Sequence, residues 1–201
     1  MDVQSWNTNG KPVFGESGEL VCTRPFPSMP IGFWNDTDNS KYQAAYFEDF
    51  PGVWTHGDYV EMTSTGGAVI YGRSDTTLNP GGVRIGTAEI YRAVENMEQI
   101  VDAVVVGRPN HGDVDVVLCV KLSDNTDFDS HLESEIRSLI RNTTTPRHVP
   151  KYIFEVDDIP YTISGKKVEK AVLDTITGRT VENKDALANP ESLDLYSALP
   201  F

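Results

Sequence analysis

The residues best suited to chemistry form a short run near the end of the chain, Ser164-Gly165-Lys166-Lys167. A lysine on a glycine-containing loop is a mobile point charge that can reach an oxyanion or a phosphate, so Lys166 is our candidate catalytic residue. The run is not a P-loop, because it lacks the glycine spaced ahead of the Gly-Lys pair and the Ser or Thr after it. Taken alone, a Gly-Lys pair is more often a solvated turn.

Three other segments could bind a nucleotide or a similar anion. Asp58 follows a glycine at the start of a strand and could hydrogen-bond the two hydroxyls of a ribose, although an ordinary Gly-Asp turn explains the same residues. Arg73 and Asp75 lie where the composition changes, and a surface ion pair is the plainer interpretation. The pair Gly81-Gly82 lets backbone approach a ligand closely, with Arg84 beside it, unless this is only a flexible hairpin tip.

The sequence contains no recognisable pattern of metal ligands or of a catalytic nucleophile. The four histidines are scattered without ligand spacing, so we expect no structural metal. No serine or cysteine has the setting of a nucleophile. Cys22 and Cys119 lie in apolar, strand-like runs and lack the spacing of a zinc site or a redox dithiol, which predicts buried, inert thiols in a reducing compartment.

The charge balance limits the kinds of partner. With 30 acidic and 17 basic residues among 201, the formal net charge is −13, which repels nucleic acid and anionic lipid headgroups. Small anions such as a nucleotide or CoA remain compatible, because local cations and backbone N–H groups set the field at a site. No run reaches the ~20 apolar residues of a membrane helix, and the N-terminus has no signal-peptide pattern. We expect a cytosolic protein without membrane or nucleic-acid partners.

The pattern of elements predicts an α+β protein with a boundary near Asp75. The first part is β-rich, with a strand over 19–23 and a hairpin whose arms are 59–62 and 68–71. The second part alternates helix and strand, and the residues after 180 are predicted to be an extended tail. Its predicted helices are 87–96, 130–141 with a capping box from Ser130 to Glu133, and 168–176; its predicted strands are 101–107, 114–122 and 152–156.

Five segments, in this order, resemble the later core motifs of the adenylate-forming acyl-CoA synthetases, and the resemblance covers essentially the whole chain. They are Gly18-Glu19-Leu20-Val21, Thr55-His56-Gly57-Asp58, Gly72-Arg73-Ser74-Asp75, the run 82–90 beginning Gly82-Val83-Arg84, and the run 160–166 ending in Ser164-Gly165-Lys166. Four further segments resemble the branch of this family that acts on acetoacetate: Trp54-Thr55-His56-Gly57-Asp58-Tyr59, Leu78-Asn79-Pro80, Arg147-His148-Val149-Pro150 and the run 189–196.

The resemblance implies an ATP-dependent acid–thiol ligase that works in two half-reactions. Acetoacetate would attack the α-phosphate of ATP, bound with Mg²⁺, to give an acyl-adenylate and pyrophosphate. The thiol of CoA would then displace AMP to give acetoacetyl-CoA, feeding ketone-body carbon to lipid synthesis. Each half-reaction builds up negative charge that must be neutralised.

The family's residue roles carry over motif by motif. Asp58, Arg73 and Arg84 would bind ATP or AMP, and Lys166 would bridge the carboxylate and the α-phosphate during adenylation. Asp75 would be the hinge of a swinging C-terminal domain. That swing would withdraw the lysine and bring up Gly81 and Gly82, where the glycines make room for the pantetheine arm of CoA. Arg141 matches a position that meets the CoA phosphates.

The implied domains are the β-rich, incomplete end of a large adenylation domain with a distorted barrel (1–74), a mobile lid domain (75–180) and the tail (181–201). The sequence also departs from the family. The residues that bind ATP phosphates, stack on adenine and line the acyl pocket are not found here, so we expect the isolated chain to be inactive without a missing N-terminal portion. Gly81 stands where relatives commonly carry serine, and the run Gly165-Lys166-Lys167-Val168-Glu169 is less basic than usual.

Two alternatives from other classes remain open. The chain could be a non-catalytic truncated paralogue or splice form that binds CoA or regulates a full-length synthetase. It could also be a free-standing β-rich interaction module, which would leave exposed strand edges in the first part.

Overall fold

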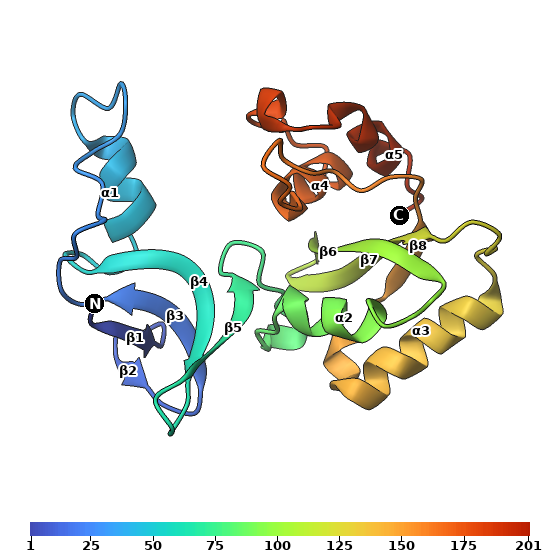
Figure 1. The fold of residues 1–201 in the computed structure, drawn as a ribbon, viewed down its shortest axis with the longest axis horizontal. Helices are drawn as coiled ribbons and strands as arrows, with labels where there is room; N and C mark the ends of the chain where they lie inside the picture. Colours follow the sequence, from blue (N-terminus) through green and yellow to red (C-terminus); the bar gives the residue numbers. More distant parts are fainter. The chain divides into compact units, whose positions relative to one another are not determined.

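The computed structural model describes residues 1–201, which form two compact units, Met1–Asp75 and Thr76–Phe201. The division lies one residue from the predicted boundary. Both sheets and helices occur, as the α+β prediction required (Figure 1). The assignment of the two units as the end of a large domain and a mobile lid stays a prediction.

The first unit is built on an antiparallel sheet with strand order β2-β1-β3-β4-β5. The predicted hairpin is present, and Gly66 in its turn has φ +82°, which only glycine adopts without strain. The strands are β1 (Val3–Trp6), β2 (Pro12–Val13), β3 (Ser17–Cys22), β4 (Trp54–Met62) and β5 (Ala68–Arg73).

Helix α1 (Ser40–Phe47) is not among the elements predicted for the β-rich first part. The Asp36 carboxylate accepts hydrogen bonds from the backbone N–H groups of Lys41 (3.1 Å) and Tyr42 (2.8 Å), which satisfies donors at the start of the helix. Tyr46 stacks on Trp54 with ring centroids 3.7 Å apart. Aromatic packing against β4 therefore holds a helix whose apolar residues lack the usual aliphatic periodicity.

The second unit contains a three-stranded sheet of β6 (Ile100–Asn110), β7 (Asp113–Leu122) and β8 (Tyr152–Glu155), in that order. β6 and β7 are antiparallel, and β8 runs parallel to β7. The loop predicted between the first two strands shrinks to His111 and Gly112, whose φ angles are +48° and +85°. Two successive positive φ angles match the twist of a tight hairpin, so both strands continue to the turn.

Both faces of this sheet are covered, which explains why its strands read as almost continuous valine runs. Side chains from alternate positions of β6 and β7 pack into two cores: Ala103, Val105, Val116 and Leu118 into one, and Val104, Val106, Val117 and Cys119 into the other. Helices α2 (Thr87–Val94) and α3 (Ser130–Thr143) cover the first face, and α4 (Glu169–Ile176) and α5 (Leu193–Ser197) the second (Figure 1).

The predicted capping box of α3 is wrong. The N-cap is Asp129, whose carboxylate accepts the backbone N–H of Leu132 at 2.8 Å. Glu133 instead forms an ion pair with Arg137, with 2.6 Å between Oε1 and Nη2. An aspartate one residue earlier in extended backbone serves the same N–H groups as a serine cap.

The sequence predicts an extended tail after residue 180, and this prediction is wrong. The last residues form short helical segments, η3 (Lys184–Ala186), η4 (Pro190–Ser192) and α5. The side chains of Leu193 and Tyr196 are buried, and the Tyr196 hydroxyl donates to the carbonyl of Asp158 at 2.9 Å. The tail is thus part of the second unit's core. Two further 3₁₀ segments, η1 (Pro80–Gly82) and η2 (Pro146–His148), lie in loops.

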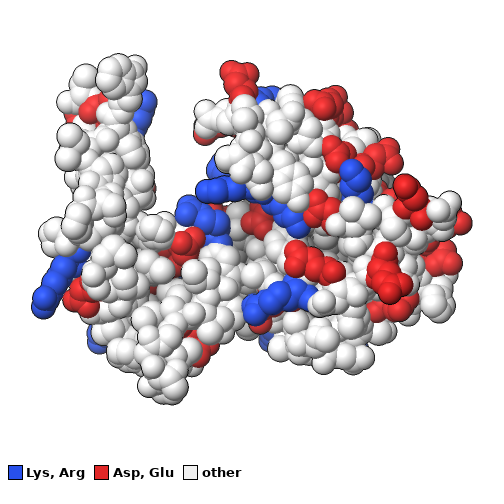
Figure 2. All heavy atoms as spheres, viewed as in Figure 1, with Lys and Arg blue, Asp and Glu red and all other residues white.

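None of the helices combines the length and apolar character that crossing a bilayer requires. Acidic side chains are spread over the visible face of the second unit (Figure 2), in keeping with the charge of −13.

Candidate functional site

Lys166 lies on a tight loop that presents it to solvent. An antiparallel bridge pairs Tyr161 with Lys167, and inside it the N–H of Thr162 donates to the carbonyl of Lys166 at 2.8 Å. The hydroxyl of Thr162 accepts the N–H of Lys166 at 3.0 Å, and Gly165 has φ +77°. The Lys166 side chain is exposed and makes no hydrogen bond or ion pair within the chain. The loop backbone is therefore fixed while its ammonium group is available.

The residues that hold this loop were missed by the sequence reasoning. The Lys167 ammonium lies 2.7 Å from the Asp102 carboxylate, which also accepts a hydrogen bond from the Tyr161 hydroxyl at 2.6 Å. Burial and the Asp102 carboxylate raise the pKa of Tyr161 above its usual range, so the phenol remains a donor. The one available signal was a single aspartate inside the apolar run 100–106.

The Gly81-Gly82 segment is a braced turn, not a flexible tip. The Gly81 N–H donates to the Asp113 carboxylate at 2.7 Å, and the Arg147 guanidinium donates to the Pro80 carbonyl at 3.3 Å. Gly81 has φ +59° and Gly82 has φ +76°. A Cβ atom on Gly81 would lie 2.6 Å from Nη1 of Arg147, so the arginine occupies the space that a side chain at 81 would need. The Gly81 N–H also lowers the pKa of Asp113.

A buried histidine and a half-buried glutamate link η2 to helix α2. His148 is buried, and its Nε2 lies 3.1 Å from the carboxylate of Glu89, which also accepts the N–H of Gly86 at 3.3 Å. The hydrogen bond from His148 lowers the pKa of Glu89 below its usual value. This histidine thus has a structural partner on a neighbouring helix.

Replacing Glu89 with Gln is expected to flatten the acid dependence of stability. A carboxyl group with a lowered folded-state pKa stabilises the protein fully above its unfolded-state pKa, about 4.3, and this stabilisation is lost as the pH falls through the lower folded-state value. Urea unfolding of the chain at pH 6 and pH 3.5 measures the difference. Glu98→Gln changes an exposed residue without an ion pair, so the free energy of unfolding should change between the two pH values as it does in the wild type. The same wild-type change in Glu89→Gln would contradict a stabilising role for the Glu89–His148 pair.

In the first unit, Asp58 and Arg73 face each other across β4 and β5. They are register partners, with 3.7 Å between Oδ1 of Asp58 and Nη1 of Arg73. Asp58 lies inside β4 rather than in a turn. A Cβ atom on Gly57 would lie 2.8 Å from Nη2 of Arg73, so this glycine makes room for the guanidinium. Nε of Arg73 also lies 3.4 Å from the Asp75 carboxylate. Asp58, Arg73 and Asp75 therefore form one polar cluster.

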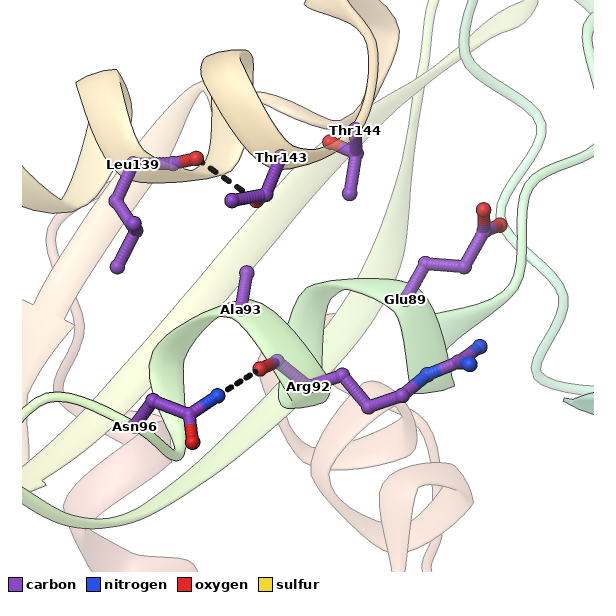
Figure 3. A pocket seen from close by; sticks show the side chains of 7 residues that line it. All are labelled: Glu89, Arg92, Ala93, Asn96, Leu139, Thr143 and Thr144. Atoms are coloured by element: carbon purple, nitrogen blue, oxygen red, sulfur yellow. Dashed lines mark hydrogen bonds between the residues drawn. The ribbon is translucent and has the colours of Figure 1, made fainter.

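Two further predicted residues lie at the surface of the second unit. Arg84 is exposed and follows the Gly81-Gly82 turn, and Arg141 is exposed in the last turn of α3. A hollow of about 330 Å³ lies between α2 and α3 (Figure 3), and none of the predicted site residues lines it. Its lining residues are Glu89, Arg92, Ala93, Asn96, Leu139, Thr143 and Thr144.

The cysteines are buried and unpaired, as predicted. Burial raises the pKa of the Cys119 thiol to about 12, which keeps it protonated and unreactive. No three His, Cys, Asp or Glu side chains of residues 1–201 are grouped so as to hold a metal ion.

Comparison with known proteins gives consistent matches along the chain. Residues 89–166 match the AMP-binding enzyme C-terminal domain. The chain is 58% identical over 197 residues to an acetoacetyl-coenzyme A synthetase of Rhizobium meliloti, covering 98% of this chain and 30% of that protein. It is 52% identical over 202 residues to an acetoacetyl-CoA synthetase of Gallus gallus, covering 100% of this chain and 30% of that protein.

Among solved structures, the acetoacetyl-CoA synthetase from Streptomyces lividans superposes with a TM-score of 0.91 at 42% identity, covering 98% of this chain and 30% of that one. The chain thus spans about 30% of the length of these relatives. Because the domain match, the sequence identity and the superposition agree, this chain is similar over its whole length to the C-terminal portion of acetoacetyl-CoA synthetases.

Proposed function

We propose that these residues are part of a ligase that converts acetoacetate, ATP and CoA to acetoacetyl-CoA, AMP and pyrophosphate. In the first half-reaction a carboxylate oxygen of acetoacetate attacks the α-phosphorus of MgATP, and pyrophosphate leaves. In the second, the CoA sulfur attacks the carbonyl carbon of the acyl-adenylate, AMP leaves, and the thiol proton passes to a base. The observation that carries the proposal is Lys166, exposed on a fixed loop within a chain similar to such enzymes over its whole length.

In adenylation, the Lys166 ammonium would neutralise charge shared by the attacking carboxylate and the α-phosphate. Asp58 would accept hydrogen bonds from the ribose hydroxyls, and Arg73, held beside it at 3.7 Å, would contact ribose or α-phosphate. Arg84 would bind the nucleotide. An anchored carboxylate and guanidinium on neighbouring strands suit this, because the ligand finds both groups already oriented.

In thioester formation, the braced turn at Gly81 and Gly82 would line the path of the pantetheine arm. Because neither glycine carries a side chain and both are exposed, a ligand can approach the backbone of this turn closely. Arg141 would meet the CoA phosphates. Arg147, whose guanidinium donates to the carbonyls of Pro80 and Gly81, is a second cation beside this turn, to which the resemblance assigned no role.

A chimaera tests the proposal. Residues 1–201 would replace the matching segment of the Rhizobium meliloti relative, and CoA-ester formation would be measured with acetoacetate and ATP. We expect acetoacetate-dependent turnover within about tenfold of the parent. A folded chimaera that makes no acetoacetyl-CoA while the parent does would overturn the proposal.

We further propose that the isolated 201 residues turn over nothing, because no Gly-, Ser- and Thr-rich phosphate loop is found among them. Acetoacetate- and ATP-dependent CoA-ester formation by the purified chain would refute this. Calorimetric titration with CoA tests one form of the non-catalytic alternative, in which the chain alone binds CoA. Buried, unpaired thiols support a cytosolic setting, where the product would serve lipid synthesis.

Asp75 would be the hinge between the two half-reactions, and it is the last residue of the first unit. Asp75→Pro is expected to change the two half-reactions unequally, because proline fixes φ near −65° and restricts the preceding residue. Asp75→Asn, which leaves φ free and keeps a side-chain oxygen that can accept from Nε of Arg73, is the control and should keep the wild-type ratio. Pyrophosphate exchange and thioester formation measured separately in the chimaera give that ratio; equal losses in Asp75→Pro would contradict a hinge.

A further inference from the structure

One carboxylate, Asp102, holds both ends of the loop that carries Lys166. Its Oδ2 accepts the hydroxyl of Tyr161 at 2.6 Å, and its Oδ1 lies 2.7 Å from Nζ of Lys167. Tyr161 and Lys167 are the bridge pair that closes the loop. The Asp102 side chain is 19% exposed, so both contacts are largely shielded from water and stronger than exposed ones.

The backbone of β6 is shaped to present this carboxylate. The pairing with β7 shifts between Ile100 and Asp102, because Ile100 pairs with Leu122 while Asp102 pairs with Lys121. Val101 is the extra residue of this bulge, and its side chain is 63% exposed. A bulge turns the residues beside it relative to a regular strand, and such bulges are frequent next to active sites.

The Lys167 ammonium is held on other sides as well. It lies 4.6 Å from the centre of the Tyr91 ring and 3.9 Å from the Glu95 carboxylate. The Tyr91 hydroxyl donates to Glu169 at 2.6 Å and accepts the N–H of Val105 at 3.0 Å. The second bond holds the Tyr91 ring against β6, an edge strand of the sheet. Lys167 therefore has little freedom, whereas Lys166 has no side-chain partner.

We propose that Asp102, acting through Tyr161 and Lys167, is the positioning residue for Lys166, and that the adenylation half-reaction depends on it while thioester formation does not. The inference rests on the proposed function of Lys166. A carboxylate that joins both ends of a short loop fixes its backbone, so the ammonium group on the intervening residue searches a small volume around the reacting phosphate. Thioester formation, which would proceed with the lysine withdrawn, lacks this requirement.

The test compares Asp102 variants in the active chimaera. Asp102→Ala loses both contacts and should lower the kcat of ATP–pyrophosphate exchange by about 10- to 100-fold. Asp102→Asn can still accept from Tyr161 but loses the ion pair with Lys167. Its kcat for ATP–pyrophosphate exchange should lie between the values for wild type and Asp102→Ala. Tyr161→Phe and Lys167→Met each remove one contact and should also be intermediate. Thioester formation from supplied acyl-adenylate, and the KM for CoA, should remain within about twofold of wild type in all four.

Asp115→Asn is the matched control. Asp115 lies on β7 of the same sheet, is 11% exposed, and both its oxygens lie 2.9 Å from Nζ of Lys151. Its loss breaks a comparable ion pair without touching the Lys166 loop. We expect any effect of this variant to fall equally on both half-reactions. An Asp102→Ala variant that behaves in the same way would reduce Asp102 to a structural role and overturn the inference.

A second readout needs no activity. In the 201-residue chain, amide hydrogen exchange of Thr162 and Lys166, whose N–H groups are bonded inside the loop, should accelerate at least tenfold in Asp102→Ala and stay unchanged in Asp115→Asn. Unchanged loop exchange in Asp102→Ala would also overturn the inference. If the wild-type chimaera is inactive, the proposed function fails, and the exchange measurement still decides whether Asp102 fixes the loop.

Discussion

Lys166→Ala in the chimaera is expected to lower ATP–pyrophosphate exchange by about 10²- to 10³-fold, the loss typical when one group that stabilises developing charge is removed. The Lys166 side chain is exposed and makes no hydrogen bond or ion pair, so its removal should leave the free energy of unfolding within about 0.5 kcal/mol of wild type. Thioester formation from supplied acyl-adenylate should be spared. Half-reaction assays and urea unfolding measure these three quantities.

The matched control is Lys184→Ala, which removes another exposed lysine of the second unit and should leave both half-reactions unchanged. Equal losses in adenylation and thioester formation by Lys166→Ala would show that the lysine acts in both steps, against the proposed withdrawal of its domain. Lys166→Arg should recover little, since a planar guanidinium does not replace a compact ammonium group at a shared contact.

Gly81→Ala is the variant expected to affect thioester formation most, with a loss on the order of 10- to 100-fold and little change in pyrophosphate exchange. A methyl group at this position would lie 2.6 Å from Nη1 of Arg147, so the guanidinium must move and release the carbonyls of Pro80 and Gly81. The turn would then lose the hydrogen bonds that Arg147 donates to it. Kinetics with varied CoA should show the change.

Gly178→Ala is the control that separates backbone strain from the collision with Arg147. Gly178 has φ +69°, and no atom lies within 4 Å of the place that a Cβ would occupy, so alanine there carries the same ~1–2 kcal/mol left-handed penalty without a collision. Thioester formation should survive this change. If Gly81→Ala acts by displacing Arg147, the double variant with Arg147→Ala should lose no more than Arg147→Ala alone; additive losses would refute the steric cause.

The fold was predictable where the local pattern and the packing agree. Valine runs indicated β6 and β7, and apolar spacing indicated α2 and α3, because these segments bury the residues that their periodicity marks. Helix α1 was missed because it packs through tyrosines against Trp54, a partner from a later strand. The prediction of an extended tail is wrong because the short helical turns there depend on burying Leu193 and Tyr196 in the second unit.

For the candidate site, the sequence indicates the exposed loops but not the residues that anchor them. Glycines beside Lys166 and at Gly81 indicate loops, and loops carry ligand contacts. Their anchors are distant in sequence: 59 residues separate Asp102 from Tyr161, and 67 separate Pro80 from Arg147. A single sequence has no local signal for such pairs, since the chain must fold before either residue meets its partner.

The β6–β7 hairpin reaches both loops, with Asp102 near its open end and Asp113 at its closed end. The stretch of β6 from Asp102 to Asn110 spans roughly 25–30 Å at the rise of a β-strand. A small ligand cannot touch both ends at once. In the proposed movement of the second unit, the hairpin would keep the two loops at a fixed separation, so that a single reaction centre would meet only one of them at a time.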